Sequence, residues 1–432
     1  MKQMKDSGIE WIGQIPEDWE VLRVKDIAKI RTGGTESRAD GADNYSTDFG
    51  MLWIKPNDLQ EFKIIDKTSE YLNDKAQANI VAFPPYTFFV CCIGSIGKFG
   101  LTNKKAYCNQ QINGIIIDDT ESKKFCMYAI MSQVGQHWYF ATGNVVKILN
   151  AYNQGRIYIA KPNKNEQQKI ANFLDDKCAK IDRLIAYEQA TIDELKAYKQ
   201  SVITESVTKG LDKSVSMKDS GVEWIGKIPK RWEIKRAKYI ATSIFKGNGI
   251  TKEDIVVDGD TPCVRYGEIY SKYNISFRQC ETRTNKSNLS VLQYFNYGDI
   301  LFAGTGELVE EIGKNIVYLG ETECLAGGDI IVLRHKQNPV FLNYALYATH
   351  SQMQKSCGKA KLKVVHISAS EIGNIYVALP PIEEQKQIAD YLDKKCADID
   401  SLISIKQQKI EELKEYKKSL IYEYVTGKKV VI

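Results

Sequence analysis

The chain repeats two of its own segments, and this duplication limits the possible architectures more than any other feature. Residues 4–30 recur at 217–243 with 17 of 27 positions identical, and residues 165–208 recur at 383–426 with 25 of 44 identical. The offsets of 213 and 218 residues are far longer than the repeats of a solenoid. Between the repeats the two halves diverge strongly. We therefore expect a tandem duplication in which each half has a shared entry segment, a private domain and a shared exit segment.

The exit segments predict two long amphipathic helices, each of about 44 residues. Apolar residues recur in them at helical spacing, while charged residues fill the other faces. Pro162 and Pro380-Pro381 mark the helix starts. The narrow apolar seam favours pairing of the two helices as a coiled coil; the alternative is that each helix packs on its own domain. The residues expected to pair the helices are Ile170, Leu174, Ile181, Ile185, Ile192, Leu195, Ile388, Leu392, Ile399, Ile403, Ile410 and Leu413.

The private domains are predicted to be mixed α/β, because strand-like apolar runs alternate with glycine-rich turns. The expected strands are 51–54, 87–90 and 113–117 in the first half and 263–264, 299–302 and 329–333 in the second. One helix is expected at 122–136 and its counterpart at 339–354. Trp11 and Trp224 are expected in the core. The chain then divides into domains at 1–163 and 213–380 and helices at 164–212 and 381–432.

Composition narrows the class of protein. The hydrophobic fraction of 43% excludes disorder as the dominant state. No apolar run is long enough for a transmembrane helix, and the first residues do not resemble a secretory signal. The ten cysteines contain no C-x-x-C pair and the four histidines do not cluster, so we expect reduced thiols, a cytoplasmic location and no metal site. The net charge of +5 is only weak evidence for a nucleic-acid partner.

Two near-motifs resemble parts of an amino-methyltransferase. Phe83-Pro84-Pro85-Tyr86 lacks the Asn or Asp that would accept a hydrogen bond from the target amino group, and residues 302–306 resemble a loop that holds adenosylmethionine. Aligning the two halves puts both near-motifs at the same place, so one element would have two different roles. No phosphate-binding loop is present either. We therefore predict no catalytic, cofactor-binding or metal-binding residues, and a protein that binds rather than catalyses.

The repeated motifs resemble the specificity subunit of type I restriction–modification enzymes. The entry motif runs from Gly8 to Pro16 with Trp19 after it, and its copy runs from Gly221 to Pro229 with Trp232 after it. The exit motif Pro380-Pro381-Ile382-Glu383-Glu384-Gln385 has the copy Glu166-Gln167. This first copy departs from the family pattern, because Lys161-Pro162-Asn163-Lys164-Asn165 precedes Glu166. The segments 94–98 and 109–111 also resemble the family.

This resemblance implies two α+β target-recognition domains joined by long helices that form an antiparallel coiled coil with pseudo-two-fold symmetry. Each domain would read one half of a bipartite, asymmetric site on double-stranded DNA, and the helices would set the spacing. Two methyltransferase subunits would bind this frame and two restriction motor-nuclease subunits could join. This chain would need no cofactor, whereas its partners would use S-adenosylmethionine, ATP and magnesium. The alternatives are a coiled-coil scaffold that does not read DNA and a self-contained DNA adenine methyltransferase.

The candidate DNA contacts lie in loops that align between the halves. Lys55 and Arg265 each begin a short polar loop after a strand, and the glycine loops at 33–34 and 247–249 could bring N–H groups to phosphates. The alternative in each case is a solvated turn. The full set is Arg31, Gly33, Gly34, Thr35, Lys55, Asn57, Lys98, Asn109, Gln110, Gln111, Lys147, Lys246, Asn248, Arg265, Tyr266, Lys355, Lys359, Lys361 and Lys363.

Overall fold

The computed structural model describes residues 3–34, 45–59, 64–73, 80–289, 291–359 and 364–431, and it divides into two compact units. Unit 1 comprises Met1–Gln189 and Gln408–Ile432, and unit 2 comprises Ala190–Gln407. The division falls within both long helices, so each unit contains the start of one helix and the end of the other. Each private domain therefore packs on parts of both exit segments.

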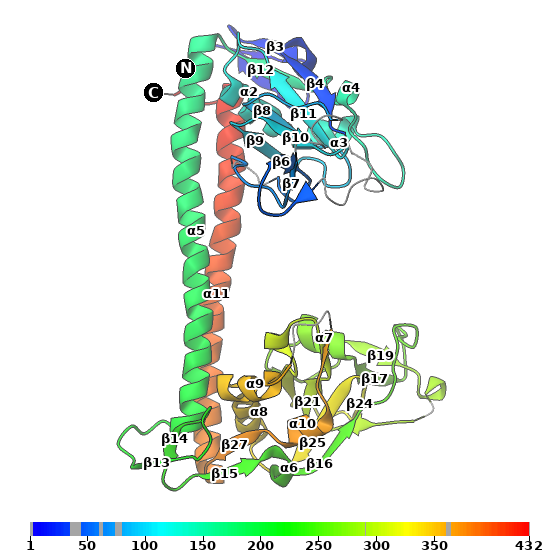
Figure 1. Cartoon of the computed structure of the whole chain (residues 1–432), viewed down its shortest axis with the longest axis vertical. Coiled ribbons are helices and arrows are strands. Elements are labelled where there is room, and N and C mark those ends of the chain that lie inside the picture. Colours follow the sequence, from blue (N-terminus) through cyan, green and yellow to red (C-terminus); the bar gives the residue numbers. More distant parts are fainter. Residues whose placement is uncertain are drawn as a thin grey trace. The chain divides into compact units, whose positions relative to one another are not determined.

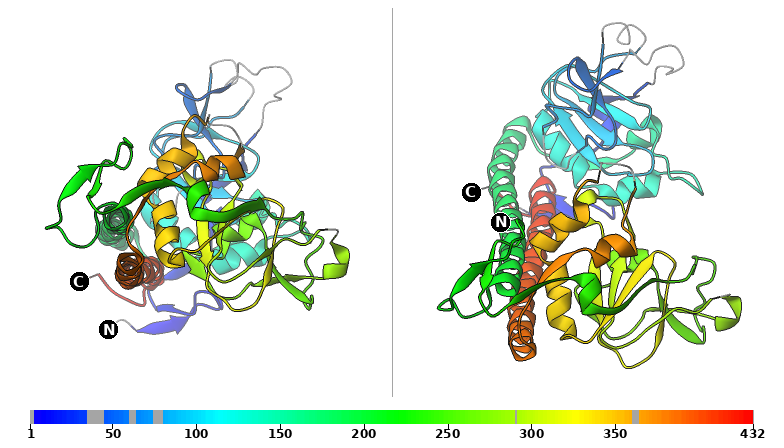
Figure 2. Two further views of the ribbon diagram at one scale, coloured as in Figure 1. Left: turned by 90° about the horizontal axis from the view of Figure 1, so that it is seen from below. Right: turned by 60° about the horizontal axis from the view of Figure 1, so that its bottom comes forward.

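The two predicted long helices are confirmed. α5 spans Lys164–Lys209 and α11 spans Ile382–Val425, within one residue of the repeated segments 165–208 and 383–426, although both helices end before the predicted limits of 212 and 432. Within each unit the two helix segments lie side by side (Figure 1 and Figure 2). In unit 1, Asp182 pairs with Lys417 at 2.7 Å and Glu188 pairs with Lys409 at 2.6 Å. Because the numbers rise on α5 as they fall on α11, the helices run antiparallel there.

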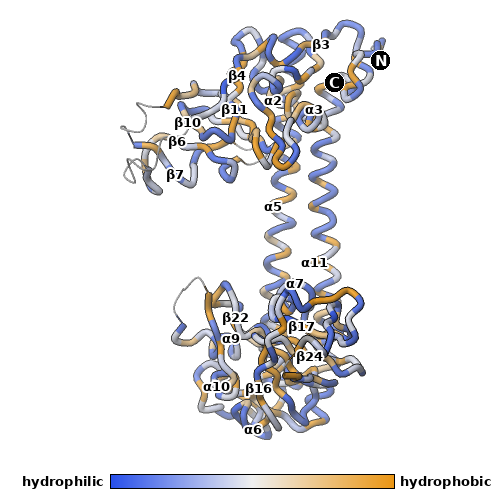
Figure 3. Tube along the Cα trace, turned by 90° about the vertical axis from the view of Figure 1, so that its right-hand side faces the viewer, coloured by the Kyte–Doolittle hydropathy of each residue, from blue (hydrophilic) through white to orange (hydrophobic). Residues whose placement is uncertain are grey.

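The apolar seam of the long helices has two roles. Near the helix starts, Ile170, Leu174, Ile388 and Leu392 are buried in the cores of their own domains, together with residues from the end of the other helix. Further along the helices, Ile181, Ile192, Ile399 and Ile410 are also buried, and Ile185, Leu195, Ile403 and Leu413 are half-buried. Hydrophobic and hydrophilic segments alternate along both helices (Figure 3). Helix pairing and packing on the domain, which we treated as alternatives, therefore occur together.

Unit 1 contains two four-stranded sheets. The first has the order β4-β11-β8-β9 and is antiparallel: Ala28–Thr32, Ile112–Ile117, Thr87–Cys91 and Phe99–Thr102. The second has the order β10-β6-β7-β5: Ala106–Cys108, Met51–Ile54, Glu70–Leu72 and Tyr45–Ser46. In this second sheet, β10 and β6 run parallel. Their carboxyl ends therefore meet at one edge.

Unit 2 repeats this arrangement. One sheet has the order β16-β25-β21-β23-β18: Ala241–Lys246, Ile330–His335, Ile300–Ala303, Asn315–Tyr318 and Ser276–Phe277. The other has the order β19-β17-β24-β20: Thr282–Thr284, Thr261–Val264, Cys324–Ala326 and Tyr294–Phe295. Here β17 and β24 run parallel, as β6 and β10 do in unit 1. The predicted strands of both halves are thus confirmed.

The helix predicted in each private domain is instead a pair of helices. α2 (Lys123–Met131) is followed by α3 (Val134–Phe140), and α8 (Pro339–Tyr347) is followed by α9 (Thr349–Ser356). The second helix of each pair brings a glutamine to the backbone of a nearby strand. Gln136 exchanges two 2.9 Å hydrogen bonds with the backbone of Tyr158, and Gln354 exchanges bonds of 3.2 and 2.8 Å with Tyr376. This tertiary contact orients the second helix of each pair. In the first half Gly135 lies in its first turn, whereas the second half has no glycine or proline at the break.

The remaining elements connect these layers. Short strands at the entry segments are β1 (Met4–Asp6), β2 (Gln14–Pro16), β3 (Glu20–Arg23), β13 (Met217–Asp219), β14 (Lys227–Pro229) and β15 (Glu233–Arg236). β3 pairs with β12 (Tyr158–Lys161) and β15 pairs with β27 (Tyr376–Leu379). The others are α4 (Ala151–Gln154), α6 (Ala237–Ile240), α7 (Tyr266–Ser271), β22 (Thr305–Gly306), β26 (Val365–His366) and α10 (Ala369–Gly373). No described helix has both the length and the apolar character needed to cross a bilayer.

The entry motif binds the long helices through its second tryptophan. The indole N–H of Trp19 donates to Glu166 at 3.3 Å, and that of Trp232 donates to Glu384 at 3.0 Å. Both tryptophans are fully buried. The prediction of a core position is wrong for Trp224, which is 40% exposed, and Trp11 is only half-buried. Trp11 packs against the ring of the exposed Tyr139, with the ring centroids 4.7 Å apart, and only the second tryptophan of each motif enters a core.

Candidate nucleic-acid interface

In unit 1 the parallel strands β6 and β10 deliver two predicted DNA-contacting loops to the same edge. The N–H of Asn109, directly after β10, donates to the carbonyl of Ile54 at the end of β6 at 3.2 Å. The glycine loop joins them, since the N–H of Gly34 donates to Cys108 O at 3.1 Å. A Cβ atom at Gly33 would lie 2.2 Å from that same carbonyl, so only glycine fits there. Segments 33–34, 55–58 and 109–111 together form what we call reading edge 1.

Unit 2 forms the same edge with the same backbone hydrogen bonds. The N–H of Gly327 donates to Val264 O at 2.8 Å, and the N–H of Asn248 donates to Ala326 O at 2.8 Å. A Cβ atom at Gly247 would lie 2.2 Å from the carbonyl of Gly327. Segments 247–249, 265–268 and 327–329 form reading edge 2. The alignment of the glycine loops and of the loops after the strands, made from sequence, is therefore confirmed in three dimensions.

The turns that begin at Lys55 and Arg265 are also equivalent. The N–H of Lys55 donates to Asp58 Oδ2 at 2.8 Å, and the N–H of Arg265 donates to Glu268 Oε2 at 2.9 Å. The return bonds, from the fourth residue to the first carbonyl, are 2.9 and 3.0 Å. In unit 2 this turn begins α7, so the loop predicted after Arg265 is the start of a helix there. The two edges therefore share the backbone of these first turns and differ in the side chains that it presents.

The third segment of reading edge 2 was missed from the sequence. Gly327, Gly328 and Asp329 occupy the positions of Asn109, Gln110 and Gln111. In both units three residues separate the parallel strand from the next one: the N–H of Ile112 donates to Asn109 O at 3.1 Å, and the N–H of Ile330 donates to Gly327 O at 3.0 Å. This shared spacing was the available signal. The two glycines had suggested only a turn.

Lys98 and Lys147 of unit 1 lie in loops that are linked to reading edge 1 by backbone hydrogen bonds. The carbonyl of Gln111 accepts from Cys92 at 2.8 Å, and Lys98 O accepts from the neighbouring Cys91 at 2.9 Å. The N–H of Gly94 donates to Lys147 O at 3.4 Å. Lys98 and Lys147 are exposed, as are Asn57 and Gln110 of the edge itself. These backbone hydrogen bonds connect the loops of Lys98 and Lys147 to reading edge 1.

Several candidate side chains are already engaged within the fold. Lys55 pairs with Glu70 at 3.0 Å, Lys246 pairs with Asp329 at 3.2 Å, and the amide of Asn248 donates to the carbonyl of Val291. Arg31 requires a correction: its guanidinium donates to the carbonyl of Ala82 and lies 4.1 Å from the centre of the Phe83 ring. Arg31 therefore connects β4 to the loop at Ala82 and Phe83, and its guanidinium does not project into solvent with the glycines.

Of the basic candidates near the end of the second domain, the structure describes Lys355 and Lys359. Lys355 is only 2% exposed, and its Nζ donates to Asn315 Oδ1 at 2.8 Å inside the domain. Burial lowers its pKa to about 7. Lys359 pairs with Glu371 at 2.7 Å. Thr35, Lys361 and Lys363 lie outside the described residues. The expectation is wrong for Lys355, because α9 turns this side chain toward the core.

Reading edge 2 is hollow. A depression of about 850 Å³ opens beside it. Four cations line it, Lys246, Lys252, Arg265 and Lys272, together with two carboxylates, Glu268 and Asp329, which leaves an excess of two positive charges. Tyr266, which also lines the hollow, is 40% exposed. Lys252 and Lys272 were not among the candidates, because neither belongs to a segment that aligns with the first half. Such a concentration of positive charge around an open concavity suits a polyanion.

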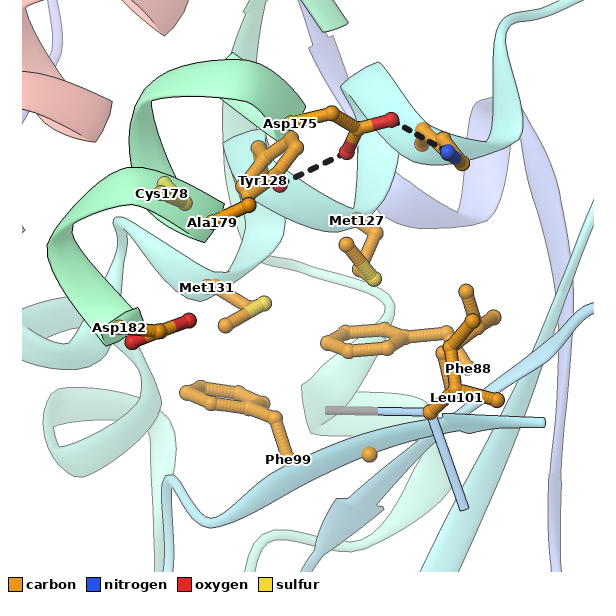
Figure 4. Close-up of a pocket in the computed structure, with 13 residues that line it drawn as sticks. Phe88, Phe99, Leu101, Met127, Tyr128, Met131, Asp175, Cys178, Ala179 and Asp182 are labelled. Carbon is orange, nitrogen blue, oxygen red and sulfur yellow. Dashed lines mark hydrogen bonds and ion pairs between the residues drawn. The ribbon is translucent and has the colours of Figure 1, made fainter. Parts of the chain in front are cut away.

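A second cavity, in unit 1, has a different character. It encloses about 290 Å³ between β8 and β9, α2 and the start of α5, and Phe88, Phe99 and Met131 line it (Figure 4). At its rim Asp175 accepts from the Tyr128 hydroxyl at 2.9 Å and pairs with Lys124. It contains no residue of reading edge 1. Among the described residues no three His, Cys, Asp or Glu side chains gather as a metal site would require.

Comparison with known proteins agrees with this geometry. The sequence model of the type I restriction modification DNA specificity domain matches residues 16–197 and, a second time, residues 229–415. The chain belongs to this family. It is thus a specificity subunit of a type I restriction–modification system, and units 1 and 2 carry its two DNA-recognition domains.

The specificity subunit has relatives of similar length. It is 24% identical to the type I restriction enzyme MjaIX specificity subunit of Methanocaldococcus jannaschii, over 86% of this chain and 85% of the relative. It is 30% identical to the HindI specificity subunit of Haemophilus influenzae, over 35% of this chain and 33% of that one. A solved structure from work on complex assembly and conformational transition of the type I R-M system has a TM-score of 0.68 at 13% identity. It covers 95% of this chain and 98% of that one. That likeness concerns the fold.

Proposed function

We propose that each unit of this specificity subunit reads one half of a bipartite, asymmetric site on double-stranded DNA, and that its reading edge makes the base contacts. The observation that carries this proposal is the shared backbone of the two edges. The same hydrogen bonds hold three segments together in each unit, while the side chains differ at nearly every position: Lys55 in unit 1 corresponds to Arg265 in unit 2, and Gln110 corresponds to Gly328. A constant framework with variable side chains suits two readers that dock alike and recognise different bases.

The chemistry of the edges supports base recognition. Each base pair presents its own pattern of donors and acceptors in the major groove, where Arg or Lys recognises guanine and Asn or Gln recognises adenine. Reading edge 1 offers the exposed amides of Asn57 and Gln110, with Lys98 and Lys147 nearby. Such cations, together with N–H groups of the glycine loops, suit contacts to phosphate, which position a protein without reading sequence. Both kinds of contact are thus available in one region of unit 1.

We propose further that two copies of one partner, the methyltransferase subunit, dock on the long helices. Three large apolar side chains are exposed at equivalent places in the two units. In unit 1 these are Leu184, Tyr187 and Tyr416; in unit 2 they are Leu402, Ile405 and Tyr198. In unit 1 the Asp182–Lys417 ion pair places Tyr416 at the same level of the helix pair as Leu184. In unit 2 the Lys199–Asp400 ion pair does the same for Tyr198 and Leu402. Two similar apolar surfaces favour two identical partners.

The subunit is proposed to provide DNA sequence specificity and to catalyse no reaction itself. Methyl transfer would come from the methyltransferase subunits with S-adenosylmethionine. DNA translocation and cleavage would come from two restriction subunits with ATP and magnesium. Purified chain, shown to be free of partner subunits, should release no methylated DNA and hydrolyse no ATP in radiolabel assays. Turnover that co-purifies with this chain through gel filtration would contradict the proposal and favour a self-contained methyltransferase.

DNA reading is tested by binding at more than one salt concentration. The complex with its methyltransferase subunits should prefer one bipartite sequence in a random DNA library at about 200 mM salt, where nonspecific binding has weakened steeply. Methylation mapping in the host genome should return the same sequence. If binding shows no sequence preference and fades with salt on every DNA alike, the runner-up function is favoured: a coiled-coil scaffold that assembles proteins without reading DNA.

A further inference from the structure

Reading edge 2 is open at a place where reading edge 1 carries side chains. Gly328 and Asp329 occupy the positions of Gln110 and Gln111, and Gly247, Gly249 and Gly328 all line the 850 Å³ hollow. A Cβ atom at Gly249 would have no neighbour within 4 Å, so the wall is not closed by packing there. Small residues thus leave room for a ligand to approach the side chain that follows β17.

That side chain is Arg265, and its hydrogen-bonding capacity is unused. Nε is buried and has no hydrogen-bond partner within the described part of the chain. The only charged contact of the guanidinium there is Nη2 to Glu268 Oε1 at 3.8 Å, which is too long for a hydrogen bond. The two hydrogen bonds of Glu268 are made by Oε2, which accepts from the N–H of Arg265 at 2.9 Å and from the hydroxyl of Thr282 at 2.9 Å. Its Oε1 lies 3.2 Å from Lys272 and accepts no hydrogen bond within the described residues. The guanidinium therefore keeps its donors for a ligand.

The position of Arg265 favours a base edge over a phosphate. Its side chain is 29% exposed, whereas that of Lys246, which lines the same hollow, is 64% exposed and Lys252 is also exposed. The more exposed cations are better placed for the DNA backbone. A planar guanidinium presents two parallel N–H donors that match O6 and N7 of guanine, whereas an ammonium is a point charge. The equivalent Lys55 of unit 1 lacks this fork and is paired with Glu70.

We propose that Arg265 reads a guanine in the half-site of unit 2 through a bidentate contact made inside the hollow. This inference rests on the proposed function, because it assumes that reading edge 2 faces the major groove. It adds the identity of one base and the residue that selects it.

The test compares Arg265→Lys with the unchanged chain, each in the complete complex with its methyltransferase subunits. Lysine keeps the positive charge and loses the fork. Methylation rates are measured on the preferred DNA and on DNAs with every single base-pair change in both half-sites. In the unchanged complex, replacing the guanine should lower the rate about 10- to 100-fold. In Arg265→Lys that penalty should disappear at one G·C pair of one half-site and persist at every other position.

Lys246→Ala provides the matched control. Lys246 lines the same hollow and is expected to contact phosphate, so its removal should slow methylation of all DNAs by a similar factor and leave every base preference intact. If Arg265→Lys behaves like this control, or relaxes a pair other than G·C, the inference is wrong while the bipartite site still supports the proposed function. If Arg265→Lys abolishes methylation, the affinity of the variant complex for the same DNAs is measured instead. Equal weakening of binding to all of them also overturns the inference. Absence of any bipartite preference in the unchanged complex would instead contradict the proposed function.

Discussion

A buried basic residue occupies one equivalent position in both units. Gln136 and Gln354 make matching contacts to a strand backbone, and the next residue is His137 in unit 1 and Lys355 in unit 2. Burial lowers the pKa of His137 to about 4 and that of Lys355 to about 7. Phe302 and His350 lie close to Lys355: its Nζ is 5.5 Å from the centre of the Phe302 ring. Burial, with a smaller contribution from Lys355, lowers the pKa of His350 to about 4. Neither position is available for DNA.

This position makes the stability of unit 2 depend on pH. The unfolded chain keeps Lys355 protonated up to about pH 10.5, whereas the folded unit releases the proton near pH 7. Between these values Lys355 binds more protons in the unfolded state than in the folded one, so its own contribution to the free energy of unfolding should rise with pH. At about 1.4 kcal/mol per pKa unit, the rise from pH 7 to pH 10 is on the order of 4 kcal/mol. Lys355→Met should remove this slope.

Thermal unfolding across that pH range measures the effect. The exposed Lys246, changed to Met, serves as the matched control and should leave the slope as it is. The slope is the informative quantity, because Lys355→Met also leaves Asn315 Oδ1 without this donor and shifts stability at every pH. Equal slopes for both variants would show that Lys355 stays charged in the folded unit.

At the scale of elements, the exit motif is explained by how each long helix begins. The amide of Gln167 donates to Pro162 O at 2.9 Å and its oxygen accepts from the N–H of Ser122 at 2.9 Å. Gln385 repeats this with Pro380 O at 2.9 Å and the N–H of Asn338 at 3.0 Å. One glutamine thus ties each long helix to the start of a domain helix. The departure of residues 161–165 from the family pattern leaves this arrangement intact.

The long helices are expected to act as a ruler between the half-sites. Four residues inserted between Gln189 and Ala190, with four more between Gln407 and Gln408, would lengthen both helices by about 6 Å. That is close to two base pairs, at about 3.4 Å each. The reading edges are untouched, so methylation mapping should return the same half-sites with an unread gap longer by one or two base pairs.

Four residues added at the end of the chain lengthen the protein without lengthening the helices, and should leave the gap unchanged. An active double-insertion variant that methylates the original sequence would show that the helices do not set the spacing.

At the scale of the whole molecule, the duplication predicts that the two proposed readers act independently. Each unit has its own hydrophobic cores and its own reading edge, and both use the same contacts between the entry motif and the long helices. Exchanging residues 31–160 for the corresponding domain of another specificity subunit should therefore change one half of the methylated sequence and preserve the other. Genome-wide methylation mapping checks this.

The reciprocal exchange, of residues 244–378, should change the other half. A single exchange that altered both halves together would show that the two units recognise DNA cooperatively and not as modules.

The sequence by itself determined those features that produce a periodic or a repeated pattern of residues. The long helices, the strands and the matching of the Lys55 and Arg265 turns all follow from patterns in one dimension. Only the tertiary structure decided which cations face solvent. The sequence around a lysine is the same whether its side chain is buried or exposed. The burial of Lys355 and the stacking of Arg31 on Phe83 could therefore not be predicted from the sequence. The equivalence of segments 109–111 and 327–329 was missed because it is defined by backbone hydrogen bonds. These bonds do not depend on side-chain identity, and the side chains of the two segments differ.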